Sequence, residues 1–339
     1  MKQLTNAHKK GIFGFWLAPS YKCNNRCRWC YAGSKLCHSI DMTLVDAKRY
    51  IKQMFDAGAR TCILVGGEPS IYPHILQVVE YAANLGIRVK MMSNGRRFAQ
   101  RSFVQDLKAA GIQNCSISIE GTEAVHDNIT MREGSFSQAI RGLENCQLED
   151  IPINSITTVG SYNLENIPDL VNFFQEFGLK RSAFNMCSSQ PSGFEEGEDA
   201  GIVDLQDYVS LVEDIGLAYD FVSFYALVPL CLFDQDKLRE LIELRRLIVS
   251  CALFARAVTV DPEGNLLPCT HMAGLSYGNL NEPEAIENFL AKKECDRTVL
   301  RTHAPSEKCV DCKLWNTCFG GCNLIWFSRS AQDHIRGVA

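Results

Sequence analysis

Short apolar segments alternate with longer segments of helical periodicity from about residue 12 to residue 219, and this alternation limits the fold more than any other feature. Such a pattern is typical of a parallel sheet whose strands are joined by crossover helices. Six units can be counted, with strands expected at residues 13–18, 61–65, 88–93, 115–119, 153–159 and 181–185. We therefore expect an α/β fold, a partial (β/α)6 barrel.

The segment after the first expected strand shows how the helices are predicted. Thr43 and Asp46 form a variant of a capping box, and Gly58 is expected to end the helix. In parallel α/β folds, functional groups gather at the carboxyl ends of the strands. The loops after the first four strands are therefore expected to share one site.

The composition argues against several classes of protein. Hydrophobic residues make up 46% and charged residues 22% of the 339 residues, as in folded globular proteins. The net charge of -5 makes nucleic acid a poor candidate partner. The apolar stretch at residues 12–18 is too short to span a membrane and lacks the pattern of an export signal, so a cytoplasmic protein without a membrane partner is expected.

Sixteen cysteines are the anomaly of the composition. Because the cytosol keeps thiols reduced, metal or metal-cluster ligation explains the closely spaced cysteines better than disulfides do. Cys62, Cys115 and Cys146 are instead isolated in apolar runs and are predicted to be small core residues.

Three cysteines follow the first expected strand with the spacing Cys23-x3-Cys27-x2-Cys30. Four thiolates would occupy every iron of a [4Fe–4S] cluster, whereas three leave one iron open for a substrate or cofactor. The alternative interpretation is a zinc knuckle that lacks one ligand.

This spacing, with the aromatic Trp29 just before the third cysteine, resembles the signature of radical S-adenosylmethionine (SAM) enzymes. The resemblance implies that the open iron chelates the amino and carboxylate groups of SAM. It also implies that reduction of the cluster cleaves SAM to a 5′-deoxyadenosyl radical, with electrons from a flavodoxin or ferredoxin type of donor.

Further segments at the expected strand ends resemble SAM-binding motifs of the same family. Residues 66–69, Gly-Gly-Glu-Pro, resemble the GGEP motif, whose backbone and carboxylate take the amino group of SAM. Other polar residues are expected at the ribose or carboxylate of SAM, although Ser118 could be structural and Arg132 an ordinary surface charge. The cofactor-binding residues that the resemblance implies are Trp29, Gly66, Gly67, Glu68, Pro69, Ser93, Asn94, Ser118, Glu120 and Arg132.

A second concentration of cysteines, C-x2-C-x5-C-x3-C, lies at residues 309–322. By itself this spacing could bind zinc. Upstream, Cys251 and Cys269 flank a segment with the pattern of a β-hairpin. Together these features resemble the SPASM domain, the auxiliary iron–sulfur domain of many radical SAM enzymes. We expect residues 1–233 to form the partial barrel and residues 234–339 to form a bridging helix and the small Cys-rich, SPASM-like domain.

The SPASM resemblance implies two auxiliary [4Fe–4S] clusters and about twelve irons per chain. It assigns Cys251, Cys269 and Cys322 to the first cluster and Cys309, Cys312 and Cys318 to the second. The seventh cysteine of the full pattern is missing after Cys322, so each cluster needs a fourth ligand. Cys231 could complete the first cluster and Asp333 or His334 the second, or an iron could stay open for substrate.

Two classes of function, an enzyme and a ferredoxin-like electron carrier, could use such clusters. A carrier has no need of an open iron beside SAM-binding motifs, so an enzyme is predicted. The resemblance implies a peptide or protein substrate that is modified by thioether or carbon–carbon crosslinking, epimerisation or oxidation. The alternative is a dehydrogenase or epimerase that acts on a small molecule such as a sugar or aminocyclitol.

Sulfatase-maturing members of the family carry an Asp after the hairpin cysteine, where this chain has Thr270, and this difference disfavours that activity. Catalytic candidates for the step after hydrogen abstraction are Cys37, Cys187 and His271, each with a structural role as its alternative. Because the first cluster ligand is already residue 23, we expect a separate partner or direct docking to present a peptide.

Overall fold

One ten-stranded sheet organises the structure, a computed structural model that describes residues 11–33, 40–187, 201–249, 251–253, 255, 257–272, 274–302, 304–326 and 330–338. The strand order is β10-β9-β1-β2-β3-β4-β5-β6-β7-β8, and all neighbouring strands are parallel except β9 and β10. The strands are β1 Gly14–Leu17, β2 Thr61–Leu64, β3 Arg88–Ser93, β4 Asn114–Ser118, β5 Ile153–Val159, β6 Ser182–Met186, β7 Val222–Tyr225, β8 Leu247–Ile248, β9 Ala257–Val260 and β10 Leu266–Leu267.

The six predicted strands are confirmed as β1 to β6, each with bounds within about one residue of those expected. The sheet continues beyond them through β7 and β8, which the sequence does not predict. The bridging helix expected from residue 234 ends at Glu243, and the chain then returns to the sheet edge as β8. A strand as short as β8 is too brief for its period to be detected in the sequence.

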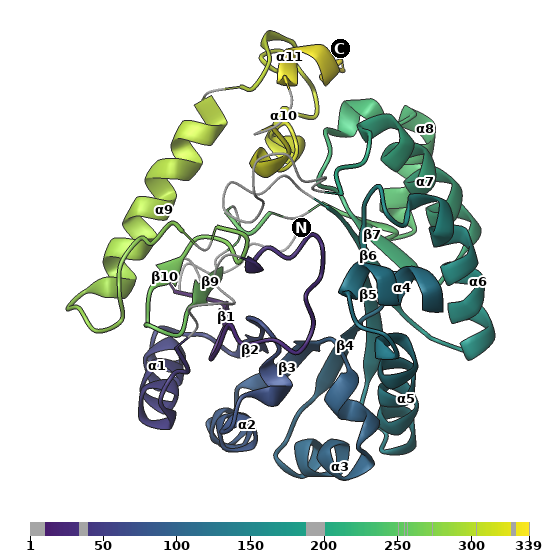
Figure 1. Ribbon diagram of the computed structural model, residues 1–339. Coiled ribbons are helices and arrows are strands. Elements are labelled where there is room, and N and C mark those ends of the chain that lie inside the picture. Colours follow the sequence, from purple (N-terminus) through teal and green to yellow (C-terminus); the bar gives the residue numbers. More distant parts are fainter. Residues whose placement is uncertain are drawn as a thin grey trace.

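The sheet is curved and open, and most helices lie on its outer side (Figure 1). This arrangement confirms the expected α/β fold with a partial barrel. In α1 the Oγ1 of Thr43 accepts the Asp46 N–H at 3.1 Å, as the predicted cap requires. The helices are α1 Leu44–Asp56, α2 Ile75–Asn84, α3 Arg101–Ala109, α4 Glu123–Thr130, α5 Ser135–Leu148, α6 Ile167–Phe177, α7 Leu205–Ala218, α8 Gln235–Glu243, α9 Ala285–Thr302, α10 Trp315–Cys318 and α11 Ala331–His334.

The core lies between the sheet and these outer helices. Along β1, Phe15 and Leu17 are buried in the same apolar cluster as Ile51 of α1. Trp16 belongs to a separate cluster with Tyr21 of the following loop. Because successive side chains of a strand point to opposite faces, the inner face of the sheet lies under the loop that follows β1.

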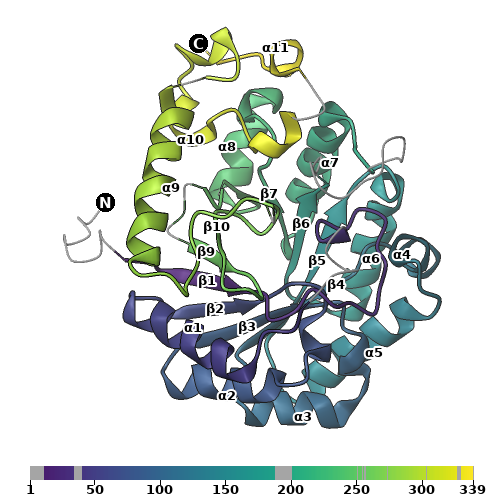
Figure 2. The ribbon, with the colours of Figure 1, turned by 60° about the vertical axis from the view of Figure 1, so that its left-hand side comes forward.

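The expected β-hairpin between Cys251 and Cys269 is confirmed as β9 and β10, which pair antiparallel. This hairpin joins the main sheet because β9 pairs parallel with β1. Figure 2 shows α9 beside the hairpin. The Lys293 ammonium of α9 is buried and donates to the backbone oxygen of Ala257 in β9. Among the described helices, none combines the length and apolar character needed to cross a bilayer.

Candidate functional site

The segment at residues 18–33, called the cluster loop below, follows β1 and carries Cys23, Cys27 and Cys30. Burial, then repulsion from Glu68, raises the pKa of Cys23 to about 12. The pKa of Cys27 is raised by burial and then by Cys30, Glu120 and Cys23. The three thiols therefore lie close together and close to two carboxyl groups.

The glycine pair at residues 66–67 packs directly against the backbone of the cluster loop. The Gly67 N–H donates to the Ser20 oxygen at 3.0 Å, and the Glu68 N–H donates to the Lys22 oxygen at 2.8 Å. A Cβ atom on Gly67 would lie 2.3 Å from the backbone oxygens of Tyr21 and Lys22. Only glycine fits here, because any side chain would displace the backbone next to Cys23.

Glu68 joins the loop after β2 to the loop after β3. Its buried carboxylate accepts the Ser70 N–H at 2.9 Å, the Ser93 hydroxyl at 2.7 Å and the Asn94 N–H at 2.7 Å. Burial raises the pKa of this carboxyl, and the three hydrogen bonds oppose that rise. The structure thus brings Glu68, Ser93 and Asn94 together. Their contacts with SAM stay a prediction.

Three polar residues that the sequence reasoning did not select hold the cluster loop in place. The Asn94 amide donates to Asn24 Oδ1 at 2.6 Å, and the Arg96 guanidinium donates to the Asn24 oxygen at 2.6 Å and Asn25 Oδ1 at 3.1 Å. The adjacent Asn24 and Asn25, which lie between two cysteines, were the feature of the sequence that could have indicated these contacts. Their partner Arg96 comes close to them because β3 packs beside β2.

Glu120 lies just after β4 and faces the same region. Its carboxylate accepts the Thr158 N–H at 2.8 Å, and burial raises its pKa to about 8. At neutral pH the carboxyl is therefore mostly protonated and can donate a hydrogen bond.

Two other predicted SAM contacts differ in how close they lie to Glu120. Ser118 is half-buried on β4, two residues away. Arg132 is exposed beyond α4, where its N–H donates to the Asp127 oxygen at 3.1 Å, so it is not at a strand end.

His126 of α4 forms a hydrogen bond with the backbone of Glu120. Its Nδ1 accepts the Glu120 N–H at 3.0 Å, and its side chain is buried. Burial lowers the pKa of His126 to about 4, against the opposing effect of Asp127. The imidazole is therefore neutral in the folded protein at neutral pH.

The neutral state of His126 predicts a loss of stability in mild acid. The unfolded histidine has a pKa near 6.5 and therefore binds a proton more readily than the folded one. The contribution of the neutral His126 to the free energy of unfolding is thus complete above about pH 6.5 and is lost as the pH falls toward 4. Between pH 7 and pH 5 we expect a loss of about 2 kcal/mol.

His126→Asn keeps an acceptor for the Glu120 N–H and should remove this dependence. The measurement is denaturant unfolding of both proteins at pH 5 and pH 7. An unchanged difference between the two pH values in the variant would contradict the assignment.

Trp29 of the cluster loop packs in the same buried cluster as Cys187. Both are buried in one apolar cluster with Ile129, and the Trp29 ring centroid lies 5.7 Å from that of Tyr162. Cys187 follows β6, where its N–H donates to the Val159 oxygen at 2.7 Å. Cys37 lies outside the described residues. A catalytic role for either cysteine stays a prediction.

His271 connects the hairpin to the cluster loop. Its Nδ1 lies 3.9 Å from Cys269 Sγ, and its ring centroid lies 5.0 Å from that of Tyr31, the residue after Cys30. Burial lowers the pKa of His271 to about 4. The neutral imidazole of His271 therefore lies close both to Cys269 after the hairpin and to Tyr31 of the cluster loop.

The cysteines of the C-terminal region form two groups. In the first, burial and then Cys251, with a smaller effect of Cys269, raise the pKa of Cys322 to about 12. In the second, burial and then Cys318, Cys231 and Cys312 raise the pKa of Cys309 to about 11. Both groups match the expected trios. Cys231, which the sequence offered as one option for the fourth ligand of the first group, lies instead with the second group.

The donor sets consist of thiols, the groups that bind the irons of iron–sulfur clusters. In the part of the chain that the structure describes, no three His, Cys, Asp or Glu side chains converge on a point where one metal ion could be held. The ligands of a [4Fe–4S] cluster bind separate irons and need not converge. Neighbouring cysteines contribute to the raised pKa of Cys27 and of Cys309. Bound iron would offset this repulsion, because a positive metal ion favours the deprotonated thiolate.

The region of the site has a match to a known family. Residues 17–174, slightly less than half of the chain, match the family model described as the radical SAM superfamily. The predicted cofactors, a [4Fe–4S] cluster and SAM, are those of this class.

The relatives that this chain resembles carry names that describe different activities. The chain is 31% identical over 188 residues to the AdoMet-dependent heme synthase of Methanosarcina barkeri, and the match covers 55% of this chain and about half, 52%, of that protein. It is 24% identical to the antilisterial bacteriocin subtilosin biosynthesis protein AlbA of Bacillus subtilis, over 90% of this chain and 66% of that protein. Its fold is similar to native anSMEcpe with bound AdoMet and Kp18Cys peptide, with a TM-score of 0.73, 19% identity, and coverage of 96% of this chain and 92% of that one.

Proposed function

We propose that this chain reductively cleaves SAM to a 5′-deoxyadenosyl radical and uses it to abstract a hydrogen atom from a peptide. One observation carries the cleavage step. Three cysteines on one loop share the carboxyl edge of β1–β4 with Glu68 and Glu120. Bound to these three thiolates, a [4Fe–4S] cluster supplies the electron that cleaves SAM and leaves one iron for its amino and carboxylate groups.

The residues around this edge would position SAM rather than react with it. Glu68 holds the loops after β2 and β3 in one geometry, so their backbone groups stay fixed while SAM binds. Glu120, protonated at neutral pH, can donate a hydrogen bond to a hydroxyl or carboxylate of SAM. Trp29 is buried in an apolar cluster beside the loop and would help to exclude water from the bound cofactor.

The C-terminal cysteines support an auxiliary-cluster domain of the SPASM type. Two separate groups of buried or half-buried cysteines lie in residues 251–322, and the first reaches the cluster loop through His271 and Tyr31. Two auxiliary clusters would move electrons to or from the substrate, with a flavodoxin or ferredoxin type of protein as the external donor.

A peptide substrate is supported by AlbA, named as a bacteriocin biosynthesis protein, and by anSMEcpe, whose structure holds a peptide. A second candidate is a tetrapyrrole, because the heme synthase of Methanosarcina barkeri is the more similar in sequence. A tetrapyrrole is a different small molecule from the sugar or aminocyclitol expected as the alternative from the sequence, which stays a prediction.

Deuterium transfer distinguishes these functions. The anaerobically reconstituted chain is reduced in the presence of SAM, with either a deuterated candidate peptide, chosen from short reading frames next to the gene, or a tetrapyrrole with deuterated side chains. Deuterium in the 5′-deoxyadenosine formed with the peptide supports the first function, and deuterium from the tetrapyrrole supports the second. Failure of the reduced chain to form 5′-deoxyadenosine under any of these conditions would contradict both.

A further inference from the structure

We infer that Cys231, a cysteine of the barrel side of the chain, is the fourth ligand of an iron–sulfur cluster that Cys309, Cys312 and Cys318 hold. The inference rests on the auxiliary clusters of the proposed function and extends them to a residue outside the C-terminal cysteine run. It replaces Asp333 and His334 as candidates for this position.

The turn that carries Cys231 is docked on the C-terminal cysteines. This turn, η6 Leu230–Leu232, follows β7. The Leu230 N–H donates to Cys318 Sγ at 3.2 Å, and the Cys322 N–H donates to the Leu227 oxygen at 2.7 Å. Cys231 is thus the chain neighbour of a residue that already contacts a ligand sulfur.

The last described residues of the chain bind two of the four sulfurs. The Arg336 N–H donates to Cys231 Sγ at 3.3 Å, and the Val338 N–H donates to Cys312 Sγ at 3.4 Å. Between them Gly337 has a φ of 71°, and a Cβ there would lie 2.6 Å from the Lys308 oxygen. Backbone N–H groups directed at sulfur stabilise the negative charge that thiolates carry in a cluster.

Cys231 lies close enough to Cys309 and Cys318 to interact with both electrostatically, in agreement with the hydrogen bonds to the sulfurs of Cys231, Cys312 and Cys318. Four thiolates would occupy all four irons, so this cluster would have no open iron, in contrast to the trio of the cluster loop.

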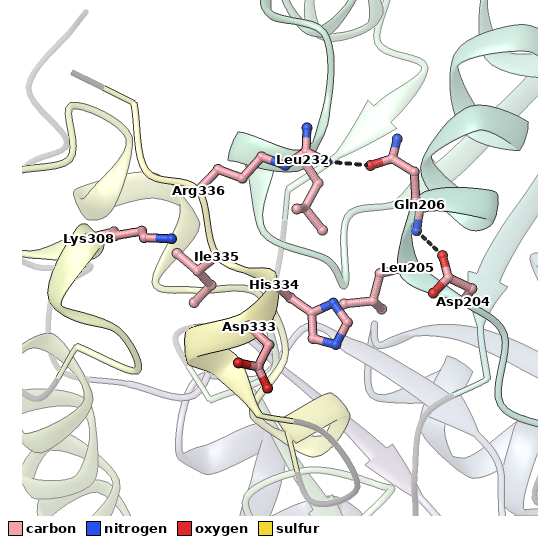
Figure 3. Close-up of a pocket in the computed structure, with 9 residues that line it drawn as sticks. All are labelled: Asp204, Leu205, Gln206, Leu232, Lys308, Asp333, His334, Ile335 and Arg336. Carbon is pink, nitrogen blue, oxygen red and sulfur yellow. Dashed lines mark hydrogen bonds between the residues drawn. The ribbon is translucent and has the colours of Figure 1, made fainter.

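The two alternative ligands, Asp333 and His334, line a pocket of about 150 Å³ together with Asp204 and with Leu232, the residue after Cys231 (Figure 3). No cysteine is among the described residues that line this pocket. The His334 ring also packs near Trp326, with 6.3 Å between centroids.

A ligand supplied from β7 and η6 would join the barrel to the C-terminal region through the metal. Because binding to such a site contributes to folding, the cluster would stabilise the contact between the two parts. The position of the C-terminal residues against Cys231 would then depend on iron.

The test isolates this cluster in the full-length chain. Alanine replaces the six cysteines of the other two groups: Cys23, Cys27, Cys30, Cys251, Cys269 and Cys322. After anaerobic reconstitution this background is expected to bind about four irons. Adding Cys231→Ala should leave one iron without a protein thiolate, seen either as a changed EPR spectrum at about four irons or as loss of that iron, with about three irons and the EPR signal of a [3Fe–4S] cluster. The control, Cys295→Ala on the exposed face of α9, should keep all four.

A second measurement uses the chain without substitutions. Iodoacetamide labelling followed by mass spectrometry compares the apo and reconstituted forms. Cys231 is expected to become protected on reconstitution together with Cys309, Cys312 and Cys318, whereas Cys295 reacts in both forms.

Two results would overturn the inference in distinguishable ways. If Cys231 reacts equally in both forms while the other three are protected, or if Cys231→Ala keeps four irons and an unchanged EPR spectrum, the cluster exists without Cys231. If the background binds no iron and Cys309, Cys312 and Cys318 also stay reactive in the reconstituted full chain, the auxiliary cluster itself is absent.

Discussion

Gly67→Ala is expected to lower the rate of SAM cleavage by about a hundredfold or more, because a shift of about 1 Å in a catalytic constellation can have that effect. The new Cβ would lie 2.3 Å from two backbone oxygens of the cluster loop and 2.5 Å from the Tyr21 carbonyl carbon. Backbone atoms cannot rotate away as side chains can, so the loop next to Cys23 must move. The same overpacking should destabilise the fold by about 1–3 kcal/mol.

The measurements are 5′-deoxyadenosine formation by the reduced, reconstituted protein and denaturant unfolding. Gly274→Ala is the matched control, since a Cβ at Gly274 meets no atom within 4 Å. Wild-type rates in Gly67→Ala would show that the close contact between the loops after β1 and β2 does not position the cluster.

Cys27→Ala should remove both the first cluster and SAM cleavage. Two thiolates hold a [4Fe–4S] cluster poorly, so the iron content of the reconstituted chain should fall by about four per molecule. No 5′-deoxyadenosine should form. Iron and sulfide analysis measures the first effect and product analysis the second.

Cys62→Ala provides the comparison with another cysteine of the same half of the chain. Cys62 is fully buried in the core of β2 and is not a proposed ligand. Its replacement should cost about 1 kcal/mol of stability and leave the iron content unchanged. An equal loss of iron in both variants would mean that Cys27 acts through the fold rather than as a ligand.

Local patterns in the sequence determined the barrel strands and most of the site. The alternation of apolar and helical segments predicts β1 to β6 because the burial of strands and helices repeats with short, regular periods. The cysteine spacing and the glycine pair were visible for a related reason. A cluster loop and a close backbone approach each require particular residue types within a few positions of one another.

Only the tertiary structure decided which distant residues support these motifs. Glu68 meets the loop after β3, and Arg96 meets Asn24, because β2 and β3 are neighbours in the sheet. Cys231 lies with the second cysteine group, not the first, because η6 docks between that group and the chain end. Such pairings depend on how elements pack, and neither period nor spacing encodes a partner that lies 26 to 105 positions away in the sequence.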